Sequence, residues 1–268
     1  MFGSAPVVKN IIILNIGVFI LQHLTNGSSY DVSNLLSLHD YRAEYFYPWQ
    51  YLTYMFTHVS KTHFFFNMIP LIILGPSLEK LLGQKKFLLF YLLVGLGAGV
   101  ATNILHSYQI NQVLQSAELI KSNLNAEGIH EFVKITNPTF FANNLDFYEL
   151  FKRYISQPHN AQLIEEAHGL IDEVINSIIN KPLLGSSGAV YGILVAAALY
   201  LPNKQLPVIP IKFKWLVLFY LIMEFRNAEK LILSGSFSHF IHLSGMLFAL
   251  LFYIIWKRKG FNTSQTMY

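Results

Sequence analysis

The chain carries FLLFYLLVGLGAGVATNIL at residues 87–105, a run without a charged side chain. A helix needs about 20 mostly apolar residues to cross the hydrocarbon layer of a bilayer. The run also contains glycine and alanine residues, which let neighbouring helices pack closely. The stretch therefore predicts a membrane-spanning helix and an all-α fold.

The composition of the whole chain agrees with a membrane protein. Hydrophobic residues make up 53% and charged residues 13%, against roughly 25% charged residues in an ordinary soluble domain. Basic residues sit in short clusters beside apolar runs, so the net charge of +4 indicates membrane topology and not a nucleic-acid partner. The chain has no cysteine, which excludes disulfides, thiolate catalysis and thiolate metal sites.

Five further apolar runs predict five more spans. Residues 183–201 carry no charge, and residues 237–256 contain two histidines but no Asp, Glu, Lys or Arg. The remaining three runs are 7–24, then 64–82, which Pro70 and Pro76 interrupt, and 215–225, which is short for a span. We expect a bundle of six transmembrane helices in contact with the lipid bilayer.

Lysine and arginine residues lie in short connections that fall on one side of the membrane only if the chain crosses it six times. Positive charge marks the cytoplasmic side. These residues are Lys80, Lys85 and Lys86 after the second span, Lys204, Lys212 and Lys214 after the fourth, and Lys257, Arg258 and Lys259 after the sixth. We therefore expect a multi-pass protein of a plasma membrane or bacterial inner membrane, with both termini cytoplasmic. The first run has one early lysine and no small-residue cleavage site, so a removable signal peptide is not expected.

The long connection between the third and fourth spans predicts a helical extramembrane insert. Apolar residues recur at helical spacing over residues 163–179, and Asn160 is a candidate N-cap. The predicted organisation is residues 1–106 for spans one to three, 107–182 for the insert, 183–256 for spans four to six, and 257–268 for a cytoplasmic tail.

Several polar residues stand within or beside the predicted spans, where a central charge costs about 2.5–3.5 kcal/mol on insertion scales. His63 and Asn67 are four residues apart and share a helix face. Gly185-Ser186-Ser187-Gly188 opens the fourth span, and Gly245 follows His242 by three residues in the sixth. Such residues call for a functional reason.

An amide bond in a membrane can be hydrolysed by a metal-bound water, a carboxylate pair or an activated hydroxyl. A zinc site would need a motif such as His-Glu-x-x-His, and the nearest string, HEFVK at 130–134, lacks the second histidine. A carboxylate pair needs two acids within spans, whereas Glu79 and Glu224 lie near span ends. The activated hydroxyl therefore remains. The sequence shows no evident acidic residue that would join the hydroxyl and its base as a third catalytic group.

Ser187 has the features of an activated nucleophile. It starts a predicted helix, where free backbone N–H groups can stabilise an oxyanion, and Gly185 and Gly188 leave room for a substrate backbone. Gly188 and Gly245 each begin a small-xxx-small spacing, which favours close packing of the fourth and sixth spans. This packing would bring Ser187 within reach of His242 as general base.

These motifs resemble those of the rhomboid family of intramembrane serine proteases. The similar strings are GSSGAVYG at 185–192, HLSG at 242–245, HFFFN at 63–67 and LGPSLEKLLGQKKF at 74–87. The resemblance covers about residues 45–106 and 183–256. Two departures are the insert and Trp49-Gln50, where the family commonly has Trp-Arg.

The resemblance implies a role for each matching residue. Ser187 is the expected nucleophile, His242 the base, and His63 and Asn67 the oxyanion donors. The expected supporting residues are Tyr191, whose ring packs on His242, together with Gly185, Gly188, Gly245 and His58. The implied reaction is hydrolysis of peptide bonds in or near transmembrane helices of other membrane proteins, with no cofactor and no metal.

Less specific interpretations remain open beside this one. Small residues in a span more often serve packing than catalysis. Glu79 is expected to cap a helix or pair with Lys80 or Lys85, and His239 is expected to be an interfacial residue. Two rival functions are a non-catalytic rhomboid-like protein that binds membrane clients, and a transporter that moves protons along its histidines, for which no inverted repeat is found.

Overall fold

The structure, a computed structural model, describes residues 5–125, 145–206, 210–234 and 237–258, together with positions 128, 132 and 136. These residues form helices and connecting loops, joined by two isolated β-bridges. The chain is therefore all-helical over the described part, as predicted. The predicted tail at 257–268 and the string at 130–134 lie almost entirely outside the described residues.

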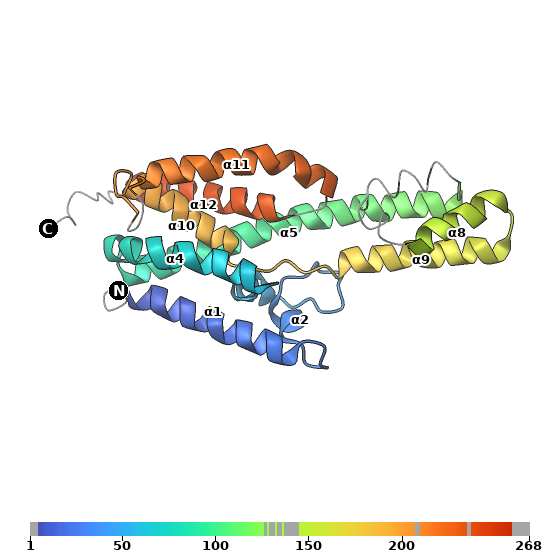
Figure 1. The fold of residues 1–268 in the computed structure, drawn as a ribbon, viewed down its shortest axis with the longest axis horizontal. Coiled ribbons are helices and arrows are strands. Elements are labelled where there is room, and N and C mark those ends of the chain that lie inside the picture. The colour runs from blue at the N-terminus through green and yellow to red at the C-terminus, as the bar shows by residue number, and fades with distance from the viewer. Residues whose placement is uncertain are drawn as a thin grey trace.

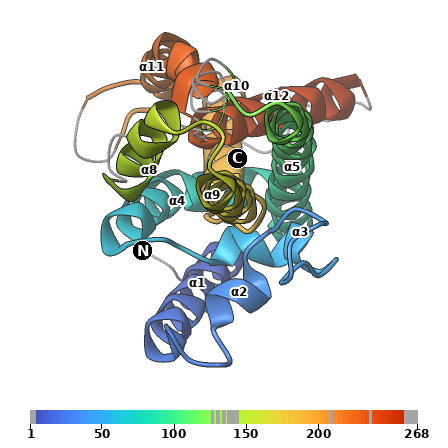
Figure 2. The ribbon, with the colours of Figure 1, turned by 90° about the vertical axis from the view of Figure 1, so that its right-hand side faces the viewer.

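Six of the described helices form a bundle around a common core (Figure 1). They are α1 (Pro6–Thr25), α4 (Lys61–Leu82), α5 (Gln84–Ser122), α10 (Ser187–Tyr200), α11 (Phe213–Ser234) and α12 (Ser238–Arg258). Helix α10 packs against α4, α5, α11 and α12. The end-on view in Figure 2 shows the other helices arranged around it. A short apolar helix is thus shielded by its neighbours.

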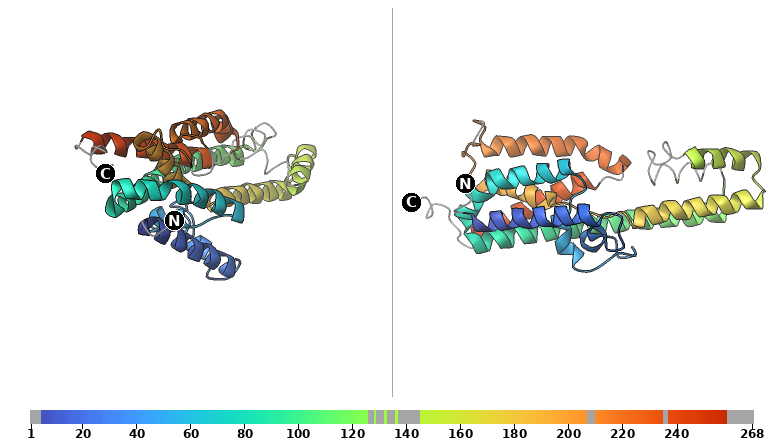
Figure 3. Two further views of the ribbon diagram at one scale, coloured as in Figure 1. Left: turned by 60° about the vertical axis from the view of Figure 1, so that its left-hand side comes forward. Right: turned by 60° about the horizontal axis from the view of Figure 1, so that its bottom comes forward.

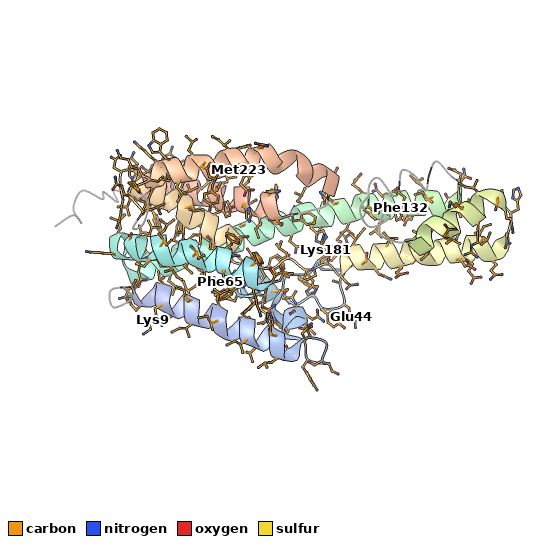
Figure 4. All side chains as sticks on the ribbon, in the orientation of Figure 1. Lys9, Glu44, Phe65, Phe132, Lys181 and Met223 are labelled. Carbon is orange, nitrogen blue, oxygen red and sulfur yellow. The ribbon has the colours of Figure 1, made fainter. Side chains whose placement is uncertain are left out.

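The outside of the bundle is apolar. Four helices, α1, α4, α5 and α12, are long and apolar enough to cross a membrane, and α10 is a shorter apolar helix. Phe65 on α4 and Met223 on α11, both labelled in Figure 4, are exposed. Other exposed apolar side chains are Ile13, Ile20, Phe66, Ile69, Phe219, Ile222, Leu247 and Leu251. Since such a surface would be unfavourable in water, this chain is an integral membrane protein.

Two helices differ from their predicted bounds. Helix α4 continues through Pro70 and Pro76, where we predicted an interruption. It begins after Ser60, whose hydroxyl accepts a hydrogen bond from the backbone N–H of His63 at 3.1 Å. Helix α5 does not end near residue 105 but continues to Ser122, so that it projects from the bundle (Figure 1).

The projecting end of α5 belongs to a second, smaller core. It packs against α9 (Ala161–Ile179), which in turn packs against α8 (Leu145–Ser156), and Figure 3 shows α5 and α9 side by side. Asn160 caps α9 as predicted, with its side chain accepting from the backbone of the first turn. The buried residues of this core are Val113, Ala117, Ile120, Phe132, Leu150, Tyr154, Leu163, Ala167, Ile171 and Val174.

The loop after α1 folds back on the bundle through a buried glutamine. The loop contains α2 (Val32–Leu36), α3 (Gln50–Thr53) and a 3-10 turn, η1 (Tyr54–Phe56). The Gln50 amide nitrogen donates to the carbonyls of Asn34 at 2.9 Å and Tyr45 at 2.6 Å, while its oxygen accepts from the N–H of His39 at 3.2 Å. A glutamine therefore anchors this loop at the position where the family commonly has arginine.

A second buried polar side chain joins the first and second long helices. Glu79 on α4 is buried, and its two carboxylate oxygens accept hydrogen bonds from the N–H groups of Val7 at 3.0 Å and Val8 at 2.8 Å. Glu79 is therefore a helix cap, but it caps the distant N-terminus of α1, where we expected a local cap or a pair with Lys80 or Lys85. A carboxylate at a helix N-terminus satisfies free N–H groups and complements the helix dipole.

Replacing Gln50 should loosen the loop without touching any catalytic candidate. We expect Gln50→Ala to lower the free energy of unfolding by about 1–3 kcal/mol, because it leaves buried backbone groups without partners. Thermal unfolding of the detergent-solubilised protein measures the effect, with Gln112→Ala, an exposed glutamine on α5, as control. Equal unfolding temperatures for the two variants would contradict the anchoring role.

Candidate active site

Ser187 is the first residue of α10, and the segment before it is held by the loop after α1. Leu183 and Leu38 exchange backbone hydrogen bonds of 2.7 and 2.9 Å, and the N–H of Gly185 donates to the carbonyl of Tyr54 at 3.0 Å. Gly185 has a φ of +110°, a conformation that favours glycine. These bonds fix where α10 begins, so Ser187 lies in its first turn beside free N–H groups.

Helices α10 and α12 touch through their backbones next to Ser187 and about one helical turn from His242. A Cβ atom added to Gly245 would overlap the carbonyl group of Gly188. A Cβ atom on Gly188 would lie 2.7 Å from that of Ala98 on α5, so three helices meet at this point. The close packing predicted from the glycine spacing is therefore present.

The His242 ring lies flat on the ring of Tyr191. The two ring centroids are 3.9 Å apart and the planes differ by 6°. Tyr191 is on α10, one helical turn after Ser187, and His242 is on α12. The stack is the contact that the resemblance implied, and it fixes the plane of the imidazole.

Glu224 on α11 forms a hydrogen bond with His242 that we did not predict from the sequence. Its Oε1 atom lies 3.0 Å from Nδ1 of His242 and accepts a hydrogen bond of 2.8 Å from the hydroxyl of Tyr191. Its Oε2 atom lies 2.6 Å from Nδ1 of His239. Glu224 is buried. His239 therefore has a carboxylate partner that we did not predict, its interfacial position stays a prediction, and an acidic partner of His242 exists.

One sequence signal could have identified Glu224. It is the acidic residue in the apolar run at 215–225, and a charged side chain in such a run calls for a partner. We missed this signal because Glu224 lies near the end of the predicted span. In the structure α11 extends to Ser234, so Glu224 lies well inside the helix.

His63 and His58 lie beside Gly185 and Ser186, the residues that precede Ser187. A Cβ atom on Gly185 would fall 2.5 Å from Cε1 and 2.8 Å from Nε2 of His63, so this ring is packed against the glycine. His58 is buried, with its Nε2 atom 3.5 Å from the hydroxyl of Ser186. The structure therefore brings both histidines to the segment that leads into Ser187.

Asn67 lies one turn further along α4 and is buried. Its amide nitrogen donates to the carbonyl of His63 at 2.9 Å, a bond within its own helix. This bond uses one donor of the amide, and a second N–H remains on the same nitrogen. The oxyanion role of His63 and Asn67 stays a prediction.

A cavity of about 280 Å³ opens beside this group of residues. Its lining includes His63 on α4, Asn103 on α5, Leu184 just before Ser187, and Ser238 at the start of α12. Lys181 and Pro182, which connect α9 to the bundle, also line it. The cavity therefore lies between the candidate site and the projecting helices.

The same region contains side chains that could hold a cation. Ligand atoms of Glu224, His239 and His242 lie within 4.8 Å of one another. Direct hydrogen bonds between the carboxylate and both imidazoles already account for this arrangement.

Comparison with known proteins agrees with the family resemblance. A family model of the rhomboid domain matches residues 46–113 and 160–259, which is more than half of the chain. A Bacillus subtilis protein described as "Putative rhomboid protease YdcA" is 36% identical over 56 residues, covering 21% of this chain and 26% of that protein. A helical membrane bundle with these motifs defines the class, and this chain belongs to the rhomboid family. The first matched stretch runs to residue 113 and the second begins at residue 160, so both reach into the predicted insert.

The contact between α10 and α12 leaves no room for a larger residue. We expect Gly245→Ala to lower the free energy of unfolding by about 1–3 kcal/mol, because the new methyl group must push two backbones apart. Gly169→Ala on α9 is the matched control, since an added Cβ there meets nothing within 4 Å. Thermal unfolding in detergent compares them, and equal stability would show that the two helices do not depend on this contact.

Proposed function

We propose that this rhomboid-family chain is an intramembrane serine endopeptidase that uses Ser187 as nucleophile and His242 as general base. The observation that carries the proposal is the backbone contact at Gly188 and Gly245, which joins the two helices next to Ser187 and about one turn from His242. The stacking of Tyr191 on His242 supports it further. The match to the B. subtilis protein covers about a quarter of that protein, so it adds to the proposal without deciding the activity.

The proposed reaction proceeds through an acyl-enzyme. His242 takes the proton of the Ser187 hydroxyl through Nε2, since its Nδ1 is bonded to Glu224. The Ser187 oxygen attacks the substrate carbonyl carbon, and the resulting oxyanion is stabilised by N–H groups at the start of α10 with His63 and Asn67. The C–N bond breaks as His242 gives its proton to the leaving amine. A water molecule, deprotonated by His242, then releases the new carboxylic acid and restores Ser187.

The proposed membrane arrangement has six spans. Helices α10 and α11 would be the fourth and fifth, because α10 is enclosed by other helices and α11 presents exposed apolar residues such as Phe219 and Ile222. Helix α1 begins and α12 ends at the same end of the bundle, opposite α8 and α9 (Figure 1). This supports cytoplasmic termini and a site that opens to the outer side, next to the insert.

The proposed substrates are membrane proteins with a transmembrane helix. The family resemblance points to single-span proteins with small residues at the cleavage site and a helix that unwinds easily. The cavity next to the site is the proposed entry for such a chain, because His63 and Leu184 line it close to Ser187.

Removing either member of the dyad should abolish cleavage. We expect Ser187→Ala and His242→Ala each to lose cleavage of a model transmembrane substrate, because they remove the nucleophile and its base. Cleavage in detergent, followed by electrophoresis, measures this, with membrane insertion and unfolding temperature as checks on folding.

Ser186→Ala is the matched control for the nucleophile, because Ser186 is the preceding hydroxyl and is expected to keep activity. Cleavage by folded Ser187→Ala protein would refute the dyad. A wild-type protein that binds membrane proteins without cutting them would instead favour the non-catalytic alternative.

The insert is proposed to select substrates without taking part in the chemistry. All buried residues of the second core lie within 110–178, so replacing this range by a short flexible linker removes that core as a unit. We expect the shortened protein to keep Ser187 reactive toward a small fluorophosphonate while the set of cleaved membrane proteins changes.

Both assays should use one detergent preparation that is shown to be folded. Loss of labelling in that preparation would mean that the insert helps to build the site. An unchanged set of cleaved proteins would mean that it does not select substrates.

A further inference from the structure

The carboxylate of Glu224 is shared by three side chains of the site. Oε1 faces the Tyr191 hydroxyl at 2.8 Å and Nδ1 of His242 at 3.0 Å, and Oε2 faces Nδ1 of His239 at 2.6 Å. The carboxylate is buried between α10, α11 and α12. An ionised carboxylate accepts hydrogen bonds only, so each of these partners donates to it.

This arrangement decides which nitrogen of His242 can act as the base. If Nδ1 carries the proton that binds Glu224, the lone pair is on Nε2 in the neutral ring. The hydrogen bond to Glu224 therefore selects the tautomer of His242 that carries its proton on Nδ1. His242 is thus held with one nitrogen occupied and the other free to take a proton.

Two restraints of different kind act on the imidazole. The stack on Tyr191 fixes the plane of the ring, and the bond to Glu224 fixes its rotation within that plane. Tyr191 also donates to Glu224, and His239 holds the second carboxylate oxygen. The orientation of Glu224 is therefore fixed by its own partners.

We propose that Glu224 is a positioning residue that completes a Ser187, His242 and Glu224 triad, with His239 orienting the carboxylate. The inference rests on the proposed protease function and deepens it. Glu224 would hold the productive tautomer of His242 and stabilise the imidazolium that forms when Ser187 loses its proton. The proton stays on His242, and Glu224 remains ionised throughout.

A structural role is the competing explanation, since a buried carboxylate that joins helices also stabilises a fold. Glu79 offers a matched comparison, because it is a second buried glutamate in the bundle and binds the N-terminus of α1. Glu79→Gln removes a buried negative charge at a distance from the dyad. It is expected to keep the wild-type kcat.

The test measures kcat and KM for a transmembrane substrate together with the rate of fluorophosphonate labelling at Ser187. We expect Glu224→Gln to lower kcat by about 100- to 10,000-fold with little change in KM, and to slow labelling in parallel. Glu224→Asp keeps a carboxylate on a shorter side chain, so its kcat should lie between those of wild type and Glu224→Gln. This rescue by charge is not expected from a purely structural role.

A kcat for Glu224→Gln within about twofold of wild type would overturn the inference, as would a kcat for Glu224→Asp no higher than that of Glu224→Gln. If Glu224→Gln does not fold, Glu224→Asp decides: a lowered kcat at unchanged KM supports the triad, and a wild-type kcat overturns it. Wild-type protein that neither cleaves nor labels would instead refute the proposed protease function.

Discussion

The backbone contact between Gly188 on α10 and Gly245 on α12 is the constraint on which the rest of the site depends. In a bilayer, apolar helices gain little by leaving lipid, so close van der Waals packing of small residues is a main source of association. Here an added Cβ at Gly245 would overlap the carbonyl of Gly188. Ser187 adjoins Gly188, and His242 lies about one helical turn before Gly245, so the contact joins the two helices close to both residues.

A second constraint acts on the chain that enters α10. Non-helical backbone at membrane depth is tolerated where protein groups satisfy its hydrogen bonds. The loop anchored by Gln50 provides them, through the paired Leu38 and Leu183 and through Tyr54, which accepts from Gly185. The site therefore combines a rigid helix contact with a loop that sets the start of the helix. Glu224 adds a link from a third helix to His242.

Local patterns in the sequence predicted the elements, while contacts between distant residues had to come from the structure. The uncharged run at 87–105 and the strings around Ser187 and His242 are local, and they identified the helices and the family. The role of Glu224 depends on the rotation of α11 against α12, which its neighbours in sequence do not reveal. Glu79 was likewise interpreted from its neighbours in sequence and Gln50 from the family motif, although their partners lie on other segments. Helix α5 extends beyond its predicted end because its second half packs against α9. This half belongs to the second core and not to the core of the membrane bundle.

The most direct test of Ser187 as the nucleophile is to map where a fluorophosphonate reacts on the purified protein. A fluorophosphonate modifies a serine whose hydroxyl is activated by a nearby base, and mass spectrometry of the peptides identifies that serine. We expect modification at Ser187, and not at Ser186 beside it. Modification of another serine, or no modification in folded protein, would contradict the claim that the junction of α10 and α12 is a hydrolytic site.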